Sequence, residues 1–336
     1  MARRKKQQDL PDNIAGLVRA LQFVSLAQEE EGSLAQTHCT IGGRSIIANN
    51  GLFSLGCPID DDFSGCPHTK RFLSALLKCD GSVSITQLPT SALSVKAGKF
   101  KATIQTVAVA DLPQMQPDAN VYPIDDGVRA ALAKVAPIAK ENAPRVVLSS
   151  VLLRENTAIA TTGTILIEAW HGFALPTMAL PKAAVDALLK IDKPLAGFGF
   201  GGSCATFYFD DGSYLRTQLY VEQWPAVDGL LNVQTRPVPM PPELWPAVEG
   251  IRDFAKRNDG YVVFGENQLQ SHRDAAAGAC YELPSFGIVG KALALDLLDV
   301  MRPHAETCDF ITYPDKAYFF SAAERTRGVI MYAIAR

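Results

Sequence analysis

Three groups of residues have types and spacings that could support metal or phosphate chemistry. Cys57, Cys66 and His68 are potential zinc ligands, and Asp60–Asp62 could hold a magnesium ion. The Cys/His spacing matches no common zinc site and no fourth ligand is evident, while a run of aspartates is typical of a solvated loop. The third group, the glycine-rich run GFGFGG at 197–202, is followed by the strand-like ATFYF and not by a helix, so it lacks the context of a phosphate loop. We therefore expect no metal and no cofactor.

Patterns typical of catalysis are also missing from the sequence. The five histidines fall in separate parts of the chain and suggest no triad, and the motifs HExxH, GxSxG and GxxxxGKS/T do not occur. These observations favour a protein that is not an enzyme. An enzyme on an unrelated α+β fold stays open as a minor alternative.

The composition is that of a globular protein. The chain has 336 residues, of which 48% are hydrophobic and 20% charged, and its net charge is −3. Such a length suggests two or three domains of about 100–150 residues. No run of about 18 apolar residues suggests a membrane span. The basic start at 1–8 runs into Asp9-Leu-Pro-Asp, unlike a signal peptide, and the seven cysteines are odd in number without CxxC spacing, so we expect a reducing cytoplasm.

An internal repeat decides the expected architecture. Segments beginning near Cys66, Leu180 and Val289 share one order: an amphipathic helix of about three turns, then three short alternating strands separated by turn residues. The helices are expected at 67–79, 181–191 and 290–304.

The front half of each repeat has its own helix, expected at 12–26, 125–140 and 241–257, followed by further strands. Six helix-plus-strands modules therefore recur at intervals of roughly 50–60 residues. Two modules make a domain, which predicts domains at 9–117, 121–233 and 238–336. Proline-containing linkers fall near Pro113–Tyr122 and Gln234–Pro242.

One helix with a few strands cannot bury both of its faces alone, whereas two such modules can. The repeat thus predicts an α+β fold in which the strands form an outer layer and both helices of a domain lie on the same side. The alternative is an α+β protein whose similar segments are accidental, which six matching periods disfavour.

Five segments resemble signatures of the bacterial DNA polymerase III beta subunit, the DNA sliding clamp. AIATTGTILIE at 158–168 resembles the strand–turn–strand "ATDG-R-L" signature, and LPKAAVDALL at 180–189 a helix entry of that family. QWPAVD at 223–228 is similar to the "fPdY" end of its central domain. ENQLQ at 266–270 is similar to a strand opening in its third domain, and GVIMYAIAR at 328–336 to its tail. The resemblance covers about 120–336 by motif and the rest by the repeat.

The resemblance implies a DNA-clamp fold of three repeated domains. In that family two chains join head to tail into a closed ring, with strands outside and helices lining the hole, and processivity comes from encircling duplex DNA without reading its bases. Over the six expected helices we count 14 Lys/Arg and 9 Asp/Glu, a net +5 that leaves −8 for the rest of the chain. A DNA-facing surface needs that sign.

The expected DNA-binding residues of the pore helices share a basic side chain. They are Arg19, Lys70, Arg71, Lys78, Arg129, Lys134, Lys140, Lys182, Lys190, Arg252, Lys256, Arg257 and Lys291. Helix surfaces carry charges in any protein, so it is the set and not any single residue that favours a pore.

The resemblance also implies a pocket for short apolar peptides of polymerase and clamp-loader partners. The matching positions are apolar or small, as such a pocket requires. They are Leu148, Thr161, Gly163, Leu166, Pro225, Leu230, Val329 and Met331. Taken singly, each of them fits an ordinary core residue better than a pocket residue.

Several residues depart from the family pattern. Thr162 replaces the signature aspartate, Ile165 the usual arginine, and Tyr332 the proline of the tail. Gly229 and Thr164 stand where the family often has an arginine and a histidine. These departures indicate a divergent member, for which a phage or prophage origin is one option, and they leave the specificity for partners open.

For the contact between chains we expect an edge strand from the first domain, at Ala92–Gly98 or Phe100–Val107. It would meet the third-domain helix around Phe254. A different class of function stays open: a clamp-fold interaction protein, such as a monomeric decoy or regulator of clamp partners, that does not encircle DNA.

Overall fold

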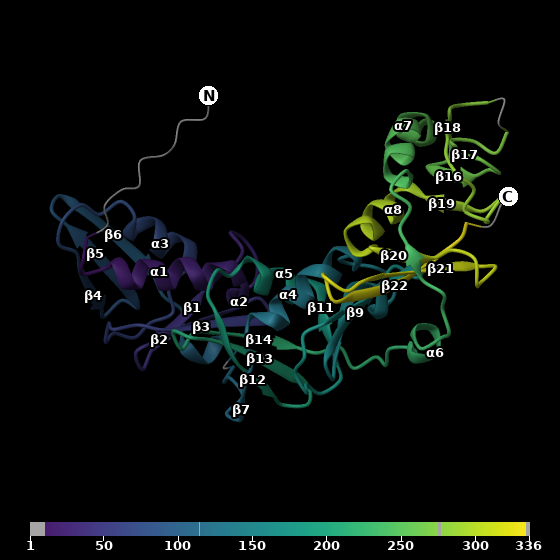
Figure 1. Cartoon of the computed structure of the whole chain (residues 1–336). Helices are drawn as coiled ribbons and strands as arrows, with labels where there is room; N and C mark the ends of the chain where they lie inside the picture. The colour runs from purple at the N-terminus through teal and green to yellow at the C-terminus, as the bar shows by residue number, and fades with distance from the viewer. Residues whose placement is uncertain (1–10, 114, 275–276, 334–336) are drawn as a thin grey trace. The chain divides into compact units, whose positions relative to one another are not determined.

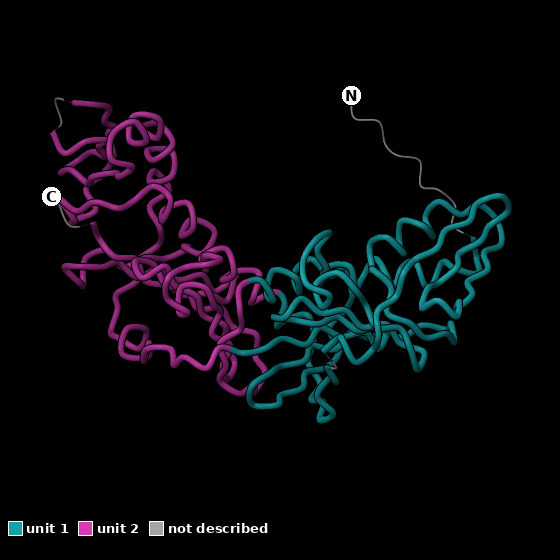
Figure 2. The backbone as a smooth tube through the Cα atoms, turned by 180° about the vertical axis from the view of Figure 1, so that it is seen from behind, with its two compact units in different colours: residues 1–129, 183–219 teal, residues 130–182, 220–336 magenta. Residues whose placement is uncertain are grey.

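The computed structural model describes residues 11–113, 115–274 and 277–333. The chain forms two compact units, residues 1–129 with 183–219 and residues 130–182 with 220–336 (Figure 2). Each unit therefore combines two separate stretches of sequence. The basic start at 1–8 and the last three residues of the expected tail lie outside the described residues. The division into three domains stays a prediction.

All six expected helices are present, and each α-helix is shorter than the sequence pattern suggested (Figure 1). The α-helices of the described residues are α1 (Ala15–Val24), α2 (Leu34–Thr37), α3 (Thr69–Leu76), α4 (Asp126–Val135), α5 (Lys182–Lys190), α6 (Asp228–Leu231), α7 (Leu244–Arg257) and α8 (Leu295–Met301). The helix expected at 290–304 is the largest correction, since its first part forms a strand and a 3₁₀ turn, Arg302–His304, continues α8.

The first unit contains two antiparallel sheets. Their strands are β1 (Cys39–Gly42), β2 (Ser45–Asn49), β3 (Phe53–Pro58), β4 (Ser84–Leu88), β5 (Ala92–Ala97), β6 (Phe100–Gln105), β7 (Val121–Pro123), β12 (Leu195–Phe200), β13 (Cys204–Phe209) and β14 (Tyr214–Gln218). The larger sheet has the order β1-β2-β3-β14-β13-β12-β7, and the smaller one β4-β5-β6. The β3–β14 pair thus joins strands that are far apart in the sequence.

The second unit also contains two sheets. Their strands are β8 (Ser150–Arg154), β9 (Thr157–Thr161), β10 (Ile165–Trp170), β11 (Met178–Pro181), β15 (Val238–Pro239), β16 (Tyr261–Phe264), β17 (Gln268–Gln270), β18 (Cys280–Glu282), β19 (Ala292–Ala294), β20 (Thr307–Asp309), β21 (Lys316–Ser321) and β22 (Thr326–Met331). The larger sheet has the order β11-β8-β9-β10-β22-β21-β20-β15, and the smaller one β18-β17-β16-β19.

Local sequence explains how helices and strands pack in the first unit. Helix α1 buries Leu17, Leu21 and Val24, spaced at four and three residues, so one apolar stripe faces β3 and α3. Strand β3 can lie close to β14 because Gly56 has no side chain. A Cβ atom at Gly56 would lie 2.2 Å from the ring of Tyr214, its cross-strand neighbour.

The linkers form structure that the sequence pattern did not predict. Part of the first linker is β7, an edge strand that pairs with β12, and part of the second is β15, an edge strand that pairs with β20. Both are short and rich in proline or exposed residues, so neither has the alternating pattern by which a strand is recognised.

Among the residues that the structure describes, none of the helices is long and apolar enough to cross a membrane. Nor does that part of the chain gather three or more His, Cys, Asp or Glu side chains in a way that could hold a metal ion. The glycine-rich run is the end of β12 and its turn into β13, in agreement with the strand-like context of the sequence.

Candidate functional site

Four helices, α1, α3, α4 and α5, carry most of the basic residues that were predicted to face DNA. Arg19, Arg71 and Lys190 are exposed on α1, α3 and α5. Lys70 on α3 is half-buried, with its Nζ 3.9 Å from Oε1 of Glu30. Lys182 is also half-buried, at the start of α5. The side chains on these helices could contact phosphate oxygens without reading sequence.

Two basic residues of α4 are bound to protein groups. Arg129 lies 2.9 Å from Asp126 and also donates to the carbonyl of Lys193, which fixes its guanidinium. Lys134 lies 2.9 Å from the carboxylate of Glu324. Lys134 is therefore partly neutralised, and the predicted role of these two residues in DNA binding stays a prediction.

Helix α7 carries one arginine, Arg252, whose charge is compensated by acidic side chains, as are the charges of the two basic residues of α4. Arg252 makes a two-pronged contact with Asp299 of α8, at 2.6 and 2.8 Å, and a second one with Glu249. Hydrogen bonds to Asp299 and Glu249 raise the pKa of Arg252, and the same bond lowers the pKa of Asp299. Lys256 and Arg257 are exposed in the last turn of α7. The neighbouring α8, LDLLDVM, has two acidic residues and no basic one.

Three of the predicted basic residues do not lie on helices. Lys78 follows the end of α3, and Lys140 follows the 3₁₀ turn after α4, because each helix ends earlier than expected. Lys291 precedes β19; its Nζ donates to the carbonyl of Pro314 and lies 5.6 Å from the ring centroid of Tyr332. The prediction that these three residues lie on helices was wrong.

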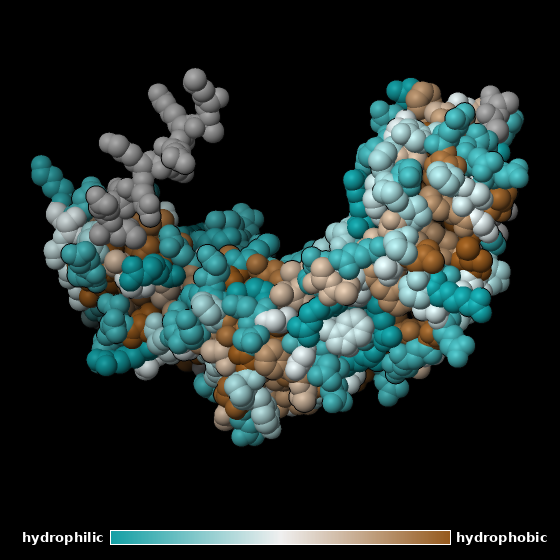
Figure 3. All heavy atoms as spheres, in the orientation of Figure 1, coloured by the Kyte–Doolittle hydropathy of each residue, from teal (hydrophilic) through white to brown (hydrophobic). Residues whose placement is uncertain are grey.

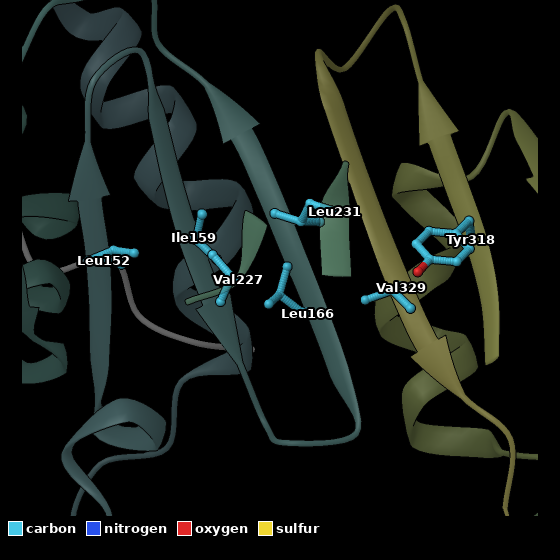
Figure 4. Packing of buried hydrophobic residues seen from close by; sticks show 7 residues of the cluster. All are labelled: Leu152, Ile159, Leu166, Val227, Leu231, Tyr318 and Val329. Carbon is cyan, nitrogen blue, oxygen red and sulfur yellow. The ribbon is translucent and has the colours of Figure 1, made fainter. Parts of the chain in front are cut away.

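Three residues predicted for the peptide pocket lie together on the large sheet of the second unit, and a fourth packs against them. Thr161 is opposite Leu166 across β9 and β10, and Leu166 is opposite Val329 across β10 and β22. Tyr318 of β21 continues this row beyond Val329. Leu230 of α6, the fourth predicted residue, packs against the apolar cluster that contains Leu166 and Val329. Figure 4 shows the buried members of this cluster. Residues far apart in the sequence thus form one continuous apolar surface of the sheet, on which Leu166 and Val329 are buried, at 4% and 2% exposed.

The segment 224–233, which includes α6, packs on this surface. Val227 and Leu231 are buried in the cluster, and Trp224 and Leu230 are partly buried against it. The hydroxyl of Tyr318 donates to the carbonyl of Leu230 at 2.8 Å, and burial raises the pKa of that tyrosine to about 12. The Trp224 Nε1 donates to Oγ of Ser150 at 3.0 Å. This segment therefore forms a wall beside the row of apolar residues.

The other predicted pocket residues lie at the margins of this surface. Met331 is two residues beyond Val329 on β22, and its N–H donates to the carbonyl of Thr164 in the turn that contains Gly163. Leu148 is half-buried in a 3₁₀ turn before β8. Pro225 is exposed and lines an open groove of ≈ 450 Å³ beside β8 and β11. Leu152, Trp224 and Val227 of the apolar cluster line the same groove, so Pro225 lies at the margin of the cluster.

A charged cluster on the same face of the sheet was missed by the sequence analysis. Glu168 of β10 is 1% exposed, and its carboxylate lies between the guanidinium groups of Arg154 and Arg327. Burial opposes the charged form of Arg154, but its bonds to Glu168 and Asp228 outweigh this effect and raise its pKa. The signal for this cluster was a single glutamate inside the otherwise apolar strand ILIEAW.

The candidates for a contact between chains lie at sheet edges. Ala92–Gly98 was wrong as an edge, since β5 is paired on both sides by β4 and β6. Phe100–Val107 contains β6, which is an edge strand of its sheet. In the second unit β18 is an edge strand, and Phe254 of α7 and Tyr281 of β18 are 49% and 40% exposed. Hydrophobic residues reach the surface in separate patches, shown in brown over the C-terminal part of the chain in Figure 3.

Comparison of the structure with known proteins gives a consistent answer. The beta chain of DNA polymerase III from Streptococcus pneumoniae superimposes with a TM-score of 0.78 at 13% identity, covering 95% of this chain and 97% of that one. The pol III beta of Caulobacter crescentus gives 0.78 at 14% identity, covering 96% and 98%. The chain has the sliding-clamp fold.

This chain shares the sliding-clamp fold but has a sequence that differs widely from those of the solved clamps. The Helicobacter pylori beta clamp, solved with a DNA ligase peptide, gives a TM-score of 0.72 at 14% identity over 95% of this chain and 98% of that one. No protein-family profile and no curated protein sequence matches the chain. The likeness is therefore one of three-dimensional structure, in which the α+β architecture expected from the repeat is confirmed.

Proposed function

We propose that this chain is a DNA sliding clamp, a non-enzymatic processivity factor that works in the cytoplasm, encircles duplex DNA and tethers replication partners. The observation that carries the proposal is the match to DNA polymerase III beta subunits over 95% or more of both chains. A match of that extent covers every part from which a clamp is built. The proposal includes the division into three clamp domains at 9–117, 121–233 and 238–336.

The basic helices support sequence-independent contact with DNA. Exposed arginine and lysine side chains on α1, α3 and α5 can approach phosphates and release counterions, which attracts any duplex equally. Such attraction does not depend on base sequence and lets a protein slide along the duplex, as a ring must. The pairing of Arg252 with Asp299 and Glu249 and the acidic character of α8 imply that Arg252 and α8 contribute less to this attraction than the exposed basic residues.

A head-to-tail pair of chains is supported by complementary strand edges. On the β4–β6 sheet, Lys96 and Lys101 are exposed and directly opposite each other, which is unfavourable within one chain. The edge strand β18 carries the exposed Glu282, and Glu266 lies just before its neighbour β17. We propose that β6 of one copy meets β18 of the other, near Phe254. Two such heterologous contacts close a two-chain ring.

The apolar row on the second unit supports peptide binding. The Helicobacter pylori beta clamp was solved with a DNA ligase peptide and a Pseudomonas aeruginosa clamp with griselimycin. In this chain the half-buried Leu230 and Met331 border the buried row of Leu166 and Val329, an apolar site suited to short apolar peptides of a polymerase or clamp loader once such a peptide packs beside the segment 224–233. Gly229 and Thr164 stand beside this site where the clamp family often has an arginine and a histidine. We therefore propose that this chain prefers different peptides from other clamps.

The test of the proposal combines mass and topology. Light scattering on a sizing column should give twice the 36.3 kDa of one chain. The chain, loaded by a clamp loader or assembled around a nicked circle, should then stay on circular DNA and leave the same DNA after linearisation. Equal retention on both forms, or loss from both, would argue against encirclement.

A second candidate is a clamp-fold interaction protein that does not encircle DNA. The neutralised Arg252 and the acidic α8 favour it, because a pore lined by such helices attracts DNA weakly on that side. This candidate predicts a mass of 36.3 kDa at micromolar concentration together with intact peptide binding.

A further inference from the structure

A buried carboxylate joins three strands of the second unit. Oε1 of Glu168 lies 2.7 Å from Nη2 of Arg154, and Oε2 lies 2.6 Å from Nε of Arg327. The three residues come from β10, β8 and β22 respectively, so the cluster spans the pair β10–β22 that joins the two stretches of chain in this unit. We call Arg154, Glu168 and Arg327 the clasp.

Both arginines of the clasp also reach the segment 224–233. Nη1 of Arg154 lies 2.8 Å from Oδ1 of Asp228. Arg327 donates from Nη1 to the carbonyl of Leu231 at 3.2 Å and from Nη2 to Oδ1 of Asn232 at 3.1 Å. The clasp therefore bonds to the beginning and the end of α6, while its centre stays on the sheet.

The segment needs such contacts to keep one conformation. Helix α6 has four residues, and a helix of one turn is not stable by itself in water. Val227 and Leu231 supply apolar anchors, but apolar contacts are not directional and do not define how the turn is oriented. Hydrogen bonds from two rigid guanidinium groups do define it.

Glu168 makes this arrangement possible. Without its carboxylate the two guanidinium groups would lie close together in a mostly buried place, with only Asp228 to balance them. A buried ion cluster is weak evidence for a stabilising role, because apolar residues of similar volume often stabilise as well. The outward bonds to Asp228, Leu231 and Asn232 indicate positioning.

We propose that Glu168 is a positioning residue for partner binding: through Arg154 and Arg327 it holds 224–233 as a preformed wall of the peptide surface. This inference rests on the proposed function for its ligand, an apolar peptide. A preformed wall spares the peptide the cost of ordering the segment, so losing the clasp weakens binding. The cross-strand positions of Leu166 and Val329 are unaffected.

The experiment measures the segment and the ligand separately. Hydrogen exchange of the amides of Leu230, Leu231 and Asn232, which bond within the α6 turn, reports on the wall without any ligand. Fluorescence anisotropy with the labelled DNA ligase peptide of the Helicobacter pylori complex reports on binding. Exposed Asp228 is replaced by alanine, because this change leaves the buried carboxylate in place, and Glu155→Ala, an exposed acidic neighbour of Arg154, is the matched control.

We expect Asp228→Ala to speed exchange of these three amides. The affinity for the peptide should fall roughly tenfold, which corresponds to the loss of about one charge-assisted contact. Arg327→Lys keeps a charge opposite Glu168 but lacks the fork that reaches Leu231 and Asn232. It should therefore lower affinity in the same way while the thermal midpoint changes little. Glu168→Gln should speed the exchange of the three amides, weaken peptide binding and also lower the midpoint of thermal unfolding.

The outcomes separate the two hypotheses. Unchanged exchange in Asp228→Ala and Arg327→Lys, or faster exchange with unchanged peptide affinity, overturns the positioning role. A wild-type chain that binds neither this peptide nor griselimycin overturns peptide tethering, and the positioning role for peptides with it. In that case the exchange data still decide whether the clasp holds the wall.

Discussion

Oε2 of Glu168 and Nε of Arg327 lie 2.6 Å apart although 159 positions separate the two residues in the sequence. Leu166 and Val329 face each other on the same two antiparallel strands, two residues before Glu168 on β10 and two residues after Arg327 on β22. An ionic contact and an apolar contact therefore join β10 and β22 side by side. The surface proposed for peptides lies directly on this joint, so changes at the joint should affect both stability and binding.

Replacing Gly328 by alanine should destabilise the joint. A Cβ atom at Gly328 of β22 would lie 2.2 Å from the ring of Phe319 and 2.7 Å from the carbonyl oxygen of Leu166. The backbone of β10 cannot give way without disturbing its pairing, so we expect a loss of about 1–3 kcal/mol in the free energy of unfolding. Urea unfolding followed by tryptophan fluorescence measures it.

Gly229→Ala is the matched control for that change. Nothing lies within 4 Å of the Cβ position at Gly229 in α6, and alanine has the higher helix propensity. The variant should unfold at the wild-type urea concentration or slightly above it. A loss of stability as large as that of Gly328→Ala would show that the close approach of Phe319 is not the cause.

Phe254→Asp should separate the two chains of the proposed ring. The side chain of Phe254 is 49% exposed on α7, so a carboxylate there costs little in the single chain. In a contact with β6 the same carboxylate would be desolvated, and dimerisation should weaken by at least tenfold. Light scattering over a range of concentrations checks this.

Val221→Asp serves as the control for dimerisation, since Val221 is 93% exposed and lies outside the proposed contact. Its mass should stay that of the wild type. Equal masses for both variants and the wild type at every concentration would show that Phe254 is not part of the contact between the chains.

Periodicity predicted the helices and the α+β fold well because each module repeats its own pattern. Apolar residues at helical spacing place Leu17, Leu21 and Val24 of α1 on one face whatever lies beyond it. The helix ends were less well predicted: α3 and α4 end before Lys78 and Lys140. The pattern at 290–304 did not reveal that Ala292–Ala294 extends a sheet, since a short apolar run fits either structure.

The site was predicted only in part because its decisive contacts are distant in sequence. The row from Thr161 to Val329 could be placed only by the resemblance to the clamp family, and no periodicity puts β10 beside β22. The ion pair between Arg252 of α7 and Asp299 of α8 could not be predicted either. A count of charges on each helix does not show which charges are paired between two helices. Pairing across elements is a property of the fold.

Duplex DNA should respond differently to two kinds of arginine substitution. Arg71→Ala removes an exposed cation of α3, whereas Arg252→Ala removes one whose charge Asp299 and Glu249 already balance. If α3 faces phosphates, Arg71→Ala should lower affinity for a short duplex and reduce the slope of log affinity against log salt by about 1. Arg252→Ala should leave the slope unchanged. Anisotropy titrations at several salt concentrations measure both, and equal slopes for the two variants would contradict the assignment.

Stability should fall as the pH is lowered below about 6.5. His171 and His304 are buried, and burial is the main reason that their pKa values lie below the ordinary 6.5. In the unfolded chain both take up a proton near pH 6.5, whereas in the folded chain they stay neutral to lower pH. The unfolded state therefore binds more protons in this window, so stability is full above pH 6.5 and is lost as the pH falls towards the folded pKa values.

Urea unfolding at pH 7.5 and pH 5.5 checks this dependence, above the range in which most carboxylates titrate. A double variant, His171→Asn with His304→Leu, keeps an acceptor for the N–H of Phe173 and removes both titrating rings. Its difference in urea midpoint between the two pH values should be smaller than that of the wild type. An undiminished difference would assign the dependence to other groups, such as His38, whose pKa burial and the neighbouring His68 also lower.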